Sequence, residues 1–525
     1  HDLKNKRVFV VAIDSLGARI PLKYKIKDEN NVVIYGNQNI ALKFSVVQKP
    51  SLEEEGWYKT AELAARTLMT VRSLSLTYKQ TDAMTIPGFK PQSGLIVKSD
   101  YGSAPGWDYA LGLQPTDFLQ RAYDKNWLIK ADSIVNPAIM TKVTDLRLKA
   151  SLEPLPGLKI DLNSARTWSY NTQIQFMNPG MPETQTGSFT MTTIAIGTAF
   201  QSSKSSNSYS SKVFQTFLDN RAVVAGRLES KMSGIEYPNS GFLMGTPFNK
   251  QKFNASNGSF DNNSADVLIP AFLAAYSGKN ITTSDLNIFP ALSALLPNWG
   301  ISYDGLSNLE FIKKYFKNVT LKHAYTCTYN VSSFSSYRTF VDAGNGLGFV
   351  RDVLTNNPIP SSRYDVSSVT LTEAFNPLFS LQGTLLNGWT LKSELRKTRT
   401  MNLSISGGQV IEANMDQYVI GTNYKISNFH PWGFLEKSKV KNDLSLTGNV
   451  TYKNQHSLLR KIEQNYTQAQ SGNQTFTIEL LGDYVISKNM NMTIFYDREA
   501  TVPLVSSYPV TSSDFGFSLR FTLNR

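Results

Sequence analysis

Residues 506–525, SSYPVTSSDFGFSLRFTLNR, close the chain and decide between two kinds of fold. Large apolar side chains occupy every second position in this stretch: Phe515, Phe517, Leu519, Phe521 and Leu523. Small or polar side chains stand between them, and an alternation of period two indicates a β-strand with one apolar and one polar face. Such a strand fits a soluble sheet whose apolar side covers a core, or a transmembrane β-barrel whose apolar side meets lipid.

The same alternation recurs through most of the chain. The stretches that show it are 146–162, 319–331, 389–405, 418–426, 443–453, 476–486 and 490–496. Strands of about ten residues or more, many of them ending in aromatic residues, are therefore predicted from about residue 73 to the C terminus. Both the length and the aromatic ends favour the membrane barrel.

The predicted connections are unequal in length. Residues 154–157 and 487–489 read as tight hairpin turns, and Asn387-Gly388 predicts a type I′ turn. Other links are long. Outer-membrane barrels show this asymmetry, because their periplasmic turns are short and their outer loops are longer.

Composition excludes several classes of protein. No run of about 18 apolar residues occurs, so the chain has no predicted transmembrane helix, and its mean hydropathy is −0.25. Cys327 is the single cysteine, so no intrachain disulfide can form. The net charge of +12 comes from Lys and Arg residues spread thinly through the chain, which argues against a nucleic-acid partner.

Three regions follow from these patterns. Residues 1–50 predict a mixed β segment that need not lie in the membrane, and residues 51–72 predict a helix, capped by Ser51, that leads into the barrel. Residues 73–525 predict barrel strands. They are interrupted at about 201–300 by a Ser-rich, helical and Asn-rich insertion. The chain starts without an initiator Met or a signal peptide pattern, which suggests a piece of a longer protein or a processed chain.

The sequence contains little that points to catalysis. Its four histidines are scattered, and no zinc, nucleotide or hydrolase motif is present, so we expect neither an enzyme nor a cofactor or metal site. The glycine-rich residues 343–349 read as a turn. His323 lies in the same strand phase as Cys327, where a packed strand residue is a better explanation than a metal ligand.

An ordered series of segments resembles one protein family. The segments are APGWDYALG (104–112), DVLIPAFLAAYSGK (266–279), LPNWGISYDGL (296–306), VTLKHAYTCTYNVSSFSSY (319–337), EAFNPLFSLQGTL (373–385), DQYVIGTNYKI (416–426) and SSYPVTSSDFGFSLRFTL (506–523). Together they resemble the C-terminal part of the SprA/Sov family, the outer-membrane translocon of the type IX secretion system of Bacteroidota. Residues 1–50 lie outside the resemblance.

The resemblance implies the C-terminal portion of a very large transmembrane antiparallel β-barrel in the bacterial outer membrane. Such a translocon passes folded cargo proteins with a C-terminal signal domain to the cell surface, and in gliding relatives it exports adhesins. It also implies a PorV-like shuttle barrel, a plug protein, the secreted cargo and the lipid bilayer as partners. Because this chain is far shorter than family members, we expect its barrel to be completed by a remaining N-terminal barrel segment of the same protein.

Particular residues follow from the barrel interpretation. Phe515 to Leu523 would form the last strand, and its end at 521–523 would be read as the signal for barrel insertion. The excess positive charge would sit in the lumen and on the periplasmic face, and the helical insertion at 212–280 would contact a partner or act as a gate. The residues predicted to face the lumen are Lys392, Glu394, Arg396, Asp443, Lys453 and Arg520.

Two alternatives remain open from the sequence. A TonB-dependent or porin-like nutrient-uptake barrel would share the strands, but neither a plug domain nor a TonB box is evident. A soluble surface protein that binds or hydrolyses glycans would share the alternation, and tryptophan-rich or paired-carboxylate sites would be expected in it.

Overall fold

A computed structural model gives the fold of the chain. It describes residues 8–13, 19–21, 23–28, 31–36, 43–48, 70–91, 104–106, 115, 117–129, 136–176, 183–201, 208–344, 346–429, 442–487, 489–505 and 508–522. The chain divides into two compact units, His1–Arg72 and Ser73–Arg525, and each is considered by itself.

The first unit is made of short strands. One sheet has the order β2-β1-β5, and β3 pairs with β4 as a hairpin. The strands are β1 (Val8–Ile13), β2 (Arg19–Ile20), β3 (Lys23–Ile26), β4 (Val32–Tyr35) and β5 (Lys43–Gln48). The helix predicted over 51–72 lies outside the described residues up to 69. Its last two positions are not helical, because Val71 and Arg72 begin β6 (Val71–Thr85).

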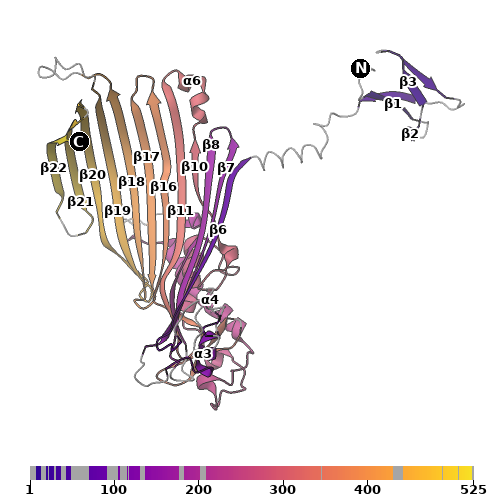
Figure 1. The fold of residues 1–525 in the computed structure, drawn as a ribbon, viewed down its shortest axis with the longest axis vertical. Helices are drawn as coiled ribbons and strands as arrows, with labels where there is room; N and C mark the ends of the chain where they lie inside the picture. The colour runs from indigo at the N-terminus through magenta and orange to yellow at the C-terminus, as the bar shows by residue number, and fades with distance from the viewer. Residues whose placement is uncertain are drawn as a thin grey trace. The chain divides into compact units, whose positions relative to one another are not determined.

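The second unit is dominated by one 14-stranded antiparallel sheet, and the prediction of an all-β antiparallel fold is confirmed. The order is β22-β21-β20-β19-β18-β17-β16-β11-β10-β8-β7-β6, and the long strands stand side by side as a broad wall (Figure 1). Among the described residues, β6 and β22 each have a neighbour on one side only. Its long strands are β7 (Ala138–Leu155), β8 (Leu158–Ile174), β11 (Phe316–Ser336), β16 (Ser368–Leu385), β17 (Thr390–Ser404), β18 (Gln409–Ile426), β19 (Leu444–Lys461), β20 (Tyr466–Ser487), β21 (Met490–Pro503) and β22 (Val510–Phe521).

The hairpin turns agree with the sequence in two of three places. Gly157 has φ +80° after Pro156 and closes β7–β8, and β20 and β21 are joined through 488–489. The type I′ prediction for Asn387-Gly388 is wrong. Only Gly388 has a positive φ, +91°, and the Leu385 amide donates to the Trp389 carbonyl at 2.7 Å, so the loop has three residues.

Two short strands share a single place in the wall. Both β9 (Thr184–Thr192) and β10 (Asn298–Tyr303) lie between β8 and β11, one beyond the other, and each pairs with both neighbours. Residues 193–297 leave the wall at the gap between them and return to it. The predicted insertion therefore connects β9 to β10, the two short strands that together fill the place between β8 and β11.

The insertion folds into helices that cover one face of the wall. Helix α4 (Lys212–Met232) begins at Ser211, whose side chain accepts a hydrogen bond from the Phe214 amide. Helix α5 (Ala265–Ser277) ends at Gly278, which has the left-handed conformation. Nearly every side chain of α5 is buried, as expected of a helix that is apolar all round.

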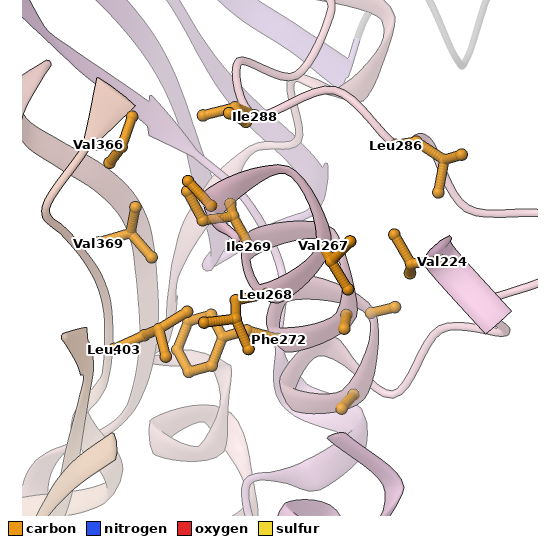
Figure 2. Packing of buried hydrophobic residues seen from close by; sticks show 14 of the residues in the cluster. Val224, Val267, Leu268, Ile269, Phe272, Leu286, Ile288, Val366, Val369 and Leu403 are labelled. Carbon is orange, nitrogen blue, oxygen red and sulfur yellow. The ribbon is translucent and has the colours of Figure 1, made fainter. Parts of the chain in front are cut away.

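A large apolar core joins the insertion to the wall. Leu268, Ile269 and Phe272 of α5 lie toward Val369 and Leu403 of the wall strands (Figure 2). The strands β12 (Val341–Asp342), β13 (Leu347–Arg351) and β15 (Tyr364–Val366) add residues to this core. The remaining small elements are β14 (Pro358–Ser362), α6 (Glu310–Lys313) and α3 (Phe118–Asp124), and α3 packs in a second, separate apolar cluster.

A candidate membrane-facing surface

The strand register assigns the side chains of β17–β22 to two faces. One row runs from Leu391 through Thr422, Gly448, Leu480 and Tyr496 to Phe515, each residue opposite the next. The face that carries this row is called the apolar face. The row beside it runs from Lys392 through Gly421, Asn449, Glu479 and Asp497 to Asp514 on the other side, which is called the polar face.

The apolar face carries a band of constant height. Along 418–426, 444–452 and 476–484 the side chains on this face are apolar or aromatic, or else Gly or Thr. Each stretch spans nine residues, and a tilted transmembrane β-strand needs about 9–11. Ile420 is 66% exposed and Phe517 is 73% exposed, so the middle of the band is open, whereas Tyr484 at one end is buried against Phe429.

Aromatic rings mark both ends of this band. Trp389 and Tyr424 stack with their ring centres 4.6 Å apart at the end nearest the β16–β17 turn. Tyr418 and Tyr452 lie 6.2 Å apart at the opposite end, and Phe476 stands across from Tyr452. Barrels place aromatic girdles at both membrane–water interfaces, and this arrangement has the same form.

The register brings the residues predicted to face a lumen onto one side. Lys392, Glu394 and Arg396 lie on the polar face of β17, Lys453 lies in the row of Arg396, and Arg520 lies on the same face of β22. Asp443 precedes β19 and pairs with Lys425 of that face at 2.7 Å. Glu394 is buried between Lys392 and Arg396, with ion pairs to both.

The residues predicted for the terminal strand lie on the opposite side. Phe515, Phe517, Leu519 and Phe521 are all on the apolar face, and each is more than half exposed. Leu523 lies outside the described residues. The register therefore separates the two predicted sets.

The apolar face changes character beyond the band. A polar belt follows, in which Lys397 pairs with Asp416 at 2.9 Å. Further along the same face, Met401, Leu403 and Val410 are fully buried in the core shared with the insertion. The insertion therefore covers the apolar face below the band and leaves the polar face open, which strand periodicity alone does not reveal.

Two buried ion pairs tie the wall to the insertion. Arg399 of β17 pairs with Glu373 of β16 at 2.8 Å and donates to the Thr198 carbonyl at 2.9 Å. The Tyr325 hydroxyl donates to Glu373 at 2.7 Å and accepts from the Ala195 amide at 2.8 Å. The insertion is thus held to three neighbouring strands at its start.

The second pair lies on the next two strands. Arg460 of β19 pairs with Glu412 of β18 at 2.8 Å and donates to the Tyr209 carbonyl at 2.8 Å. Tyr276 of α5 donates its hydroxyl hydrogen to Glu412. These buried bonds hold the insertion against the wall, and the gate predicted from the sequence stays a prediction. Contact with a partner remains a prediction.

Side chains complete the hydrogen bonding at the gap between β9 and β10. The Cys327 amide donates to the Asn298 side-chain oxygen at 2.8 Å, and the Ala165 amide donates to the Thr192 hydroxyl at 3.1 Å. Both side chains are buried. They replace the backbone groups that a continuous strand would have supplied at this point.

The described residues contain no group of three or more His, Cys, Asp and Glu side chains arranged to hold a metal ion. His323 instead lies 2.6 Å from the Leu378 carbonyl, as a packed strand residue would. In the same described part of the chain, no helix has both the length and the apolar character needed to cross a membrane.

Comparison with known proteins adds little. No family model and no curated protein matches the sequence. Among solved structures, the crystal structure of the beta domain of the Bordetella autotransporter Brka has 6% sequence identity and a TM-score of 0.20. The match covers 74% of this chain and 92% of that chain. At that score the two folds are too unlike for an inference.

Proposed function

We propose that this chain forms part of the wall of a large outer-membrane β-barrel of the SprA/Sov type, which conducts folded proteins to the cell surface in type IX secretion. One observation carries the membrane part of the proposal. The apolar band has the height of a bilayer core on one face of the wall, while the opposite face is mainly polar and charged, with Val419, Leu481, Val485 and Phe495 as apolar residues among them.

The open edges support a wall larger than this chain. An edge strand has unpaired backbone groups, and lipid offers them no partner, so β6 and β22 need further strands beside them. A remaining barrel segment of the same protein would supply those strands. The wall already has 12 strand positions side by side, because β9 shares a position with β10 and β15 lies off the main order. Further strands would therefore give a barrel that encloses a wide channel, since barrels of about 16–18 strands already leave an aqueous one.

The polar face suits the passage of protein. It carries charges of both signs, among them Lys392, Glu394, Lys453 and Asp497, with Ser, Thr and Asn between them. Apolar side chains on this face are few, and Leu481 and Phe495 stand opposite each other among them, so a folded cargo would meet mostly polar groups. In this proposal the protein neither forms nor breaks covalent bonds, and the energy for transport comes from another component of the cell envelope.

The partners follow from the resemblance. They are a PorV-like shuttle barrel that receives the cargo, a plug that seals the channel, and cargo proteins with a C-terminal signal domain. The insertion on the apolar face, just beyond the band, is a candidate surface for one of them.

Native purification tests the proposal. The protein is tagged after Arg525, extracted in detergent from the outer membrane, and everything that accompanies it is identified by mass spectrometry. We expect a further barrel segment, a PorV-like barrel and a plug. Recovery of a soluble, solitary 58.5 kDa protein would overturn both the barrel and the family.

A second outcome separates the proposal of an outer-membrane barrel from the proposal of a secretion function. If the protein is found in the outer membrane with a small-solute receptor or alone as a channel, the barrel stands and the secretion function fails. Retention of cargo inside cells that lack the protein is the matching positive result.

A further inference from the structure

Two adjoining grooves lie on the apolar face, within the band. One has a volume of about 580 Å³ and crosses β11–β20, and the other has a volume of about 550 Å³ and crosses β18–β21. They share Thr422, Gly448 and Leu480, so they form one trough, called the apolar trough. Lys392 is the one charged residue among those lining either groove.

Glycines make this trough deep. Gly448 and Gly482 lie on the apolar face of β19 and β20. All the remaining band positions on this face of the two strands carry a larger side chain. A Cβ at Gly482 would lie 3.6 Å from the Leu446 side chain, an ordinary contact, so no steric clash requires glycine there. At Gly383, in contrast, the Phe316 ring lies over the backbone and a Cβ would come within 2.8 Å of it.

A short connector forms one end of the trough. Residues 304–315 join β10 to β11 and include α6, and Leu306 and Ile312 of this connector line the trough. The Leu386 amide of the β16–β17 turn donates to the Tyr315 carbonyl at 3.0 Å, which places the connector at the end of the band nearest that turn. The connector therefore projects from the apolar face at the edge of the band.

The outer side of the connector combines apolar and basic residues. Leu309, Phe311 and Tyr315 are 44%, 67% and 57% exposed. Lys313 and Lys314 are also exposed, as is Lys317 at the start of β11, and the Lys314 ammonium lies 5.6 Å from the Tyr315 ring centre. Two acids, Asp304 and Glu310, lie earlier in the connector, so its C-terminal end is the basic one.

We propose that the connector and the apolar trough bind an anionic lipid, with its acyl chains in the trough and its phosphate at Lys313 and Lys314. This inference rests on the proposed membrane location of the wall and adds a specific ligand to it. Aromatic and lysine side chains side by side at the edge of an apolar surface are typical of membrane interfaces. The apolar lining suits acyl chains, and the cluster of lysines suits a phosphate.

The headgroup arm of the test uses Lys313→Gln with Lys314→Gln. The complete complex is purified in detergent and titrated with phosphatidylglycerol or with phosphatidylcholine of the same chains, and bound lipid is measured by native mass spectrometry. The wild type is expected to prefer phosphatidylglycerol. The double variant is expected to lose about thirtyfold in affinity for it, or about 2 kcal/mol for two lysines. Lys231→Gln with Lys279→Gln, both exposed in the insertion, is the matched control.

The part of the test that concerns the acyl chains uses Gly482→Val, which fills the trough without a backbone clash. Weaker binding of both lipids, with the preference for phosphatidylglycerol retained, is expected. Equal binding of the two lipids by the wild type, or no effect of the connector lysines, would overturn the inference while the protein remains in the membrane. A protein that is soluble without detergent would overturn the proposed function as well.

Discussion

Arg460 has no solvent-exposed side-chain surface, although its guanidinium is charged at every physiological pH. Burial of a charge is costly unless it is paired and hydrogen-bonded. Arg460 is paired with Glu412, bonded to the Tyr209 carbonyl and placed 5.5 Å from the Phe214 ring centre. The same logic applies to Arg399 and Glu373, so each pair fixes the position of the insertion rather than adding net stability.

Replacement of one partner of a buried pair should therefore strongly destabilise the contact between the insertion and the wall. Arg460→Met is expected to lower the free energy for opening of α5 by about 3–5 kcal/mol, because Glu412 is left as a buried charge that is no longer balanced. Hydrogen exchange of the α5 amides in detergent measures this. Lys159→Met breaks the exposed pair with Asp161 and should leave the exchange unchanged. Equal effects of the two substitutions would contradict the role of the buried pair.

Asp266 predicts a pH dependence in the same helix. Burial raises the pKa of its carboxyl, against hydrogen bonds from Ser362 and Ser361 that lower it. The folded state therefore holds this proton to higher pH than the unfolded state, and stability falls as pH rises above about 4, the ordinary pKa of Asp. Asp266→Asn should abolish this fall in the opening free energy of α5. Identical pH profiles for the two proteins would show that Asp266 is not its source.

At the scale of elements, the wall continues across a broken strand because side chains bridge the break. Thr192 ends β9 and its hydroxyl accepts from the Ala165 amide, while Asn298 begins β10 and accepts from the Cys327 amide. Each bond satisfies a backbone N–H that would otherwise be buried without a partner. A gap in a strand is thus compatible with a continuous wall.

A matched pair of substitutions tests this bridge. Thr192→Val keeps the shape but removes the acceptor for the Ala165 amide, and is expected to cost about 1–3 kcal/mol. Thr192→Ser keeps the hydroxyl and should be close to the wild type. Exchange of the Ala165 amide and thermal unfolding report the difference. If valine and serine behave alike, the hydroxyl is not the relevant group.

The last three strands carry an unusual row of acids. Glu479, Asp497 and Asp514 stand opposite one another on the polar face of β20, β21 and β22. Like charges directly opposite are destabilising. Asp497→Asn should therefore stabilise the wall by about 0.2–1 kcal/mol in thermal unfolding. Asp483→Asn, which weakens the 2.6 Å bond from the Thr493 hydroxyl instead, should not. Destabilisation by Asp497→Asn would mean that a cation or a basic partner strand balances the row.

At the scale of the whole molecule, the different character of the two faces of the wall is what the proposed membrane location rests on. Phe517 and Ser518 are neighbours in β22 but lie on opposite faces. The apolar band would be in lipid and the polar face in a water-filled channel, so one substitution should have very different costs at the two positions.

Arginine at these positions provides the comparison. Phe517→Arg should lower the folding free energy in lipid vesicles by about 2–4 kcal/mol, the cost of a cation on the lipid face near mid-membrane. Ser518→Arg should have little effect. Folding is measured by the shift in electrophoretic mobility without heating. Similar costs at both positions would remove the distinction between the faces and with it the membrane assignment.

The alternation in the sequence was sufficient to predict much of this wall. Strands along 443–453 and 476–486, the hairpin at 154–157 and the common face of Lys392 and Arg396 all follow from a period of two, because side chains on a strand alternate whatever lies beside it. The Asn387-Gly388 turn was misjudged, since the loop length is set by which flanking residues pair and not by the two turn residues alone.

The sequence by itself determined many of the strands and their two faces, because these depend on local periodicity. Tertiary structure alone decided that β9 and β10 share one place in the wall, that the insertion covers the apolar face, and that Glu373, Arg399, Glu412 and Arg460 meet in pairs. These contacts join residues far apart in the chain, and their partners are selected by packing and register, which no local pattern encodes.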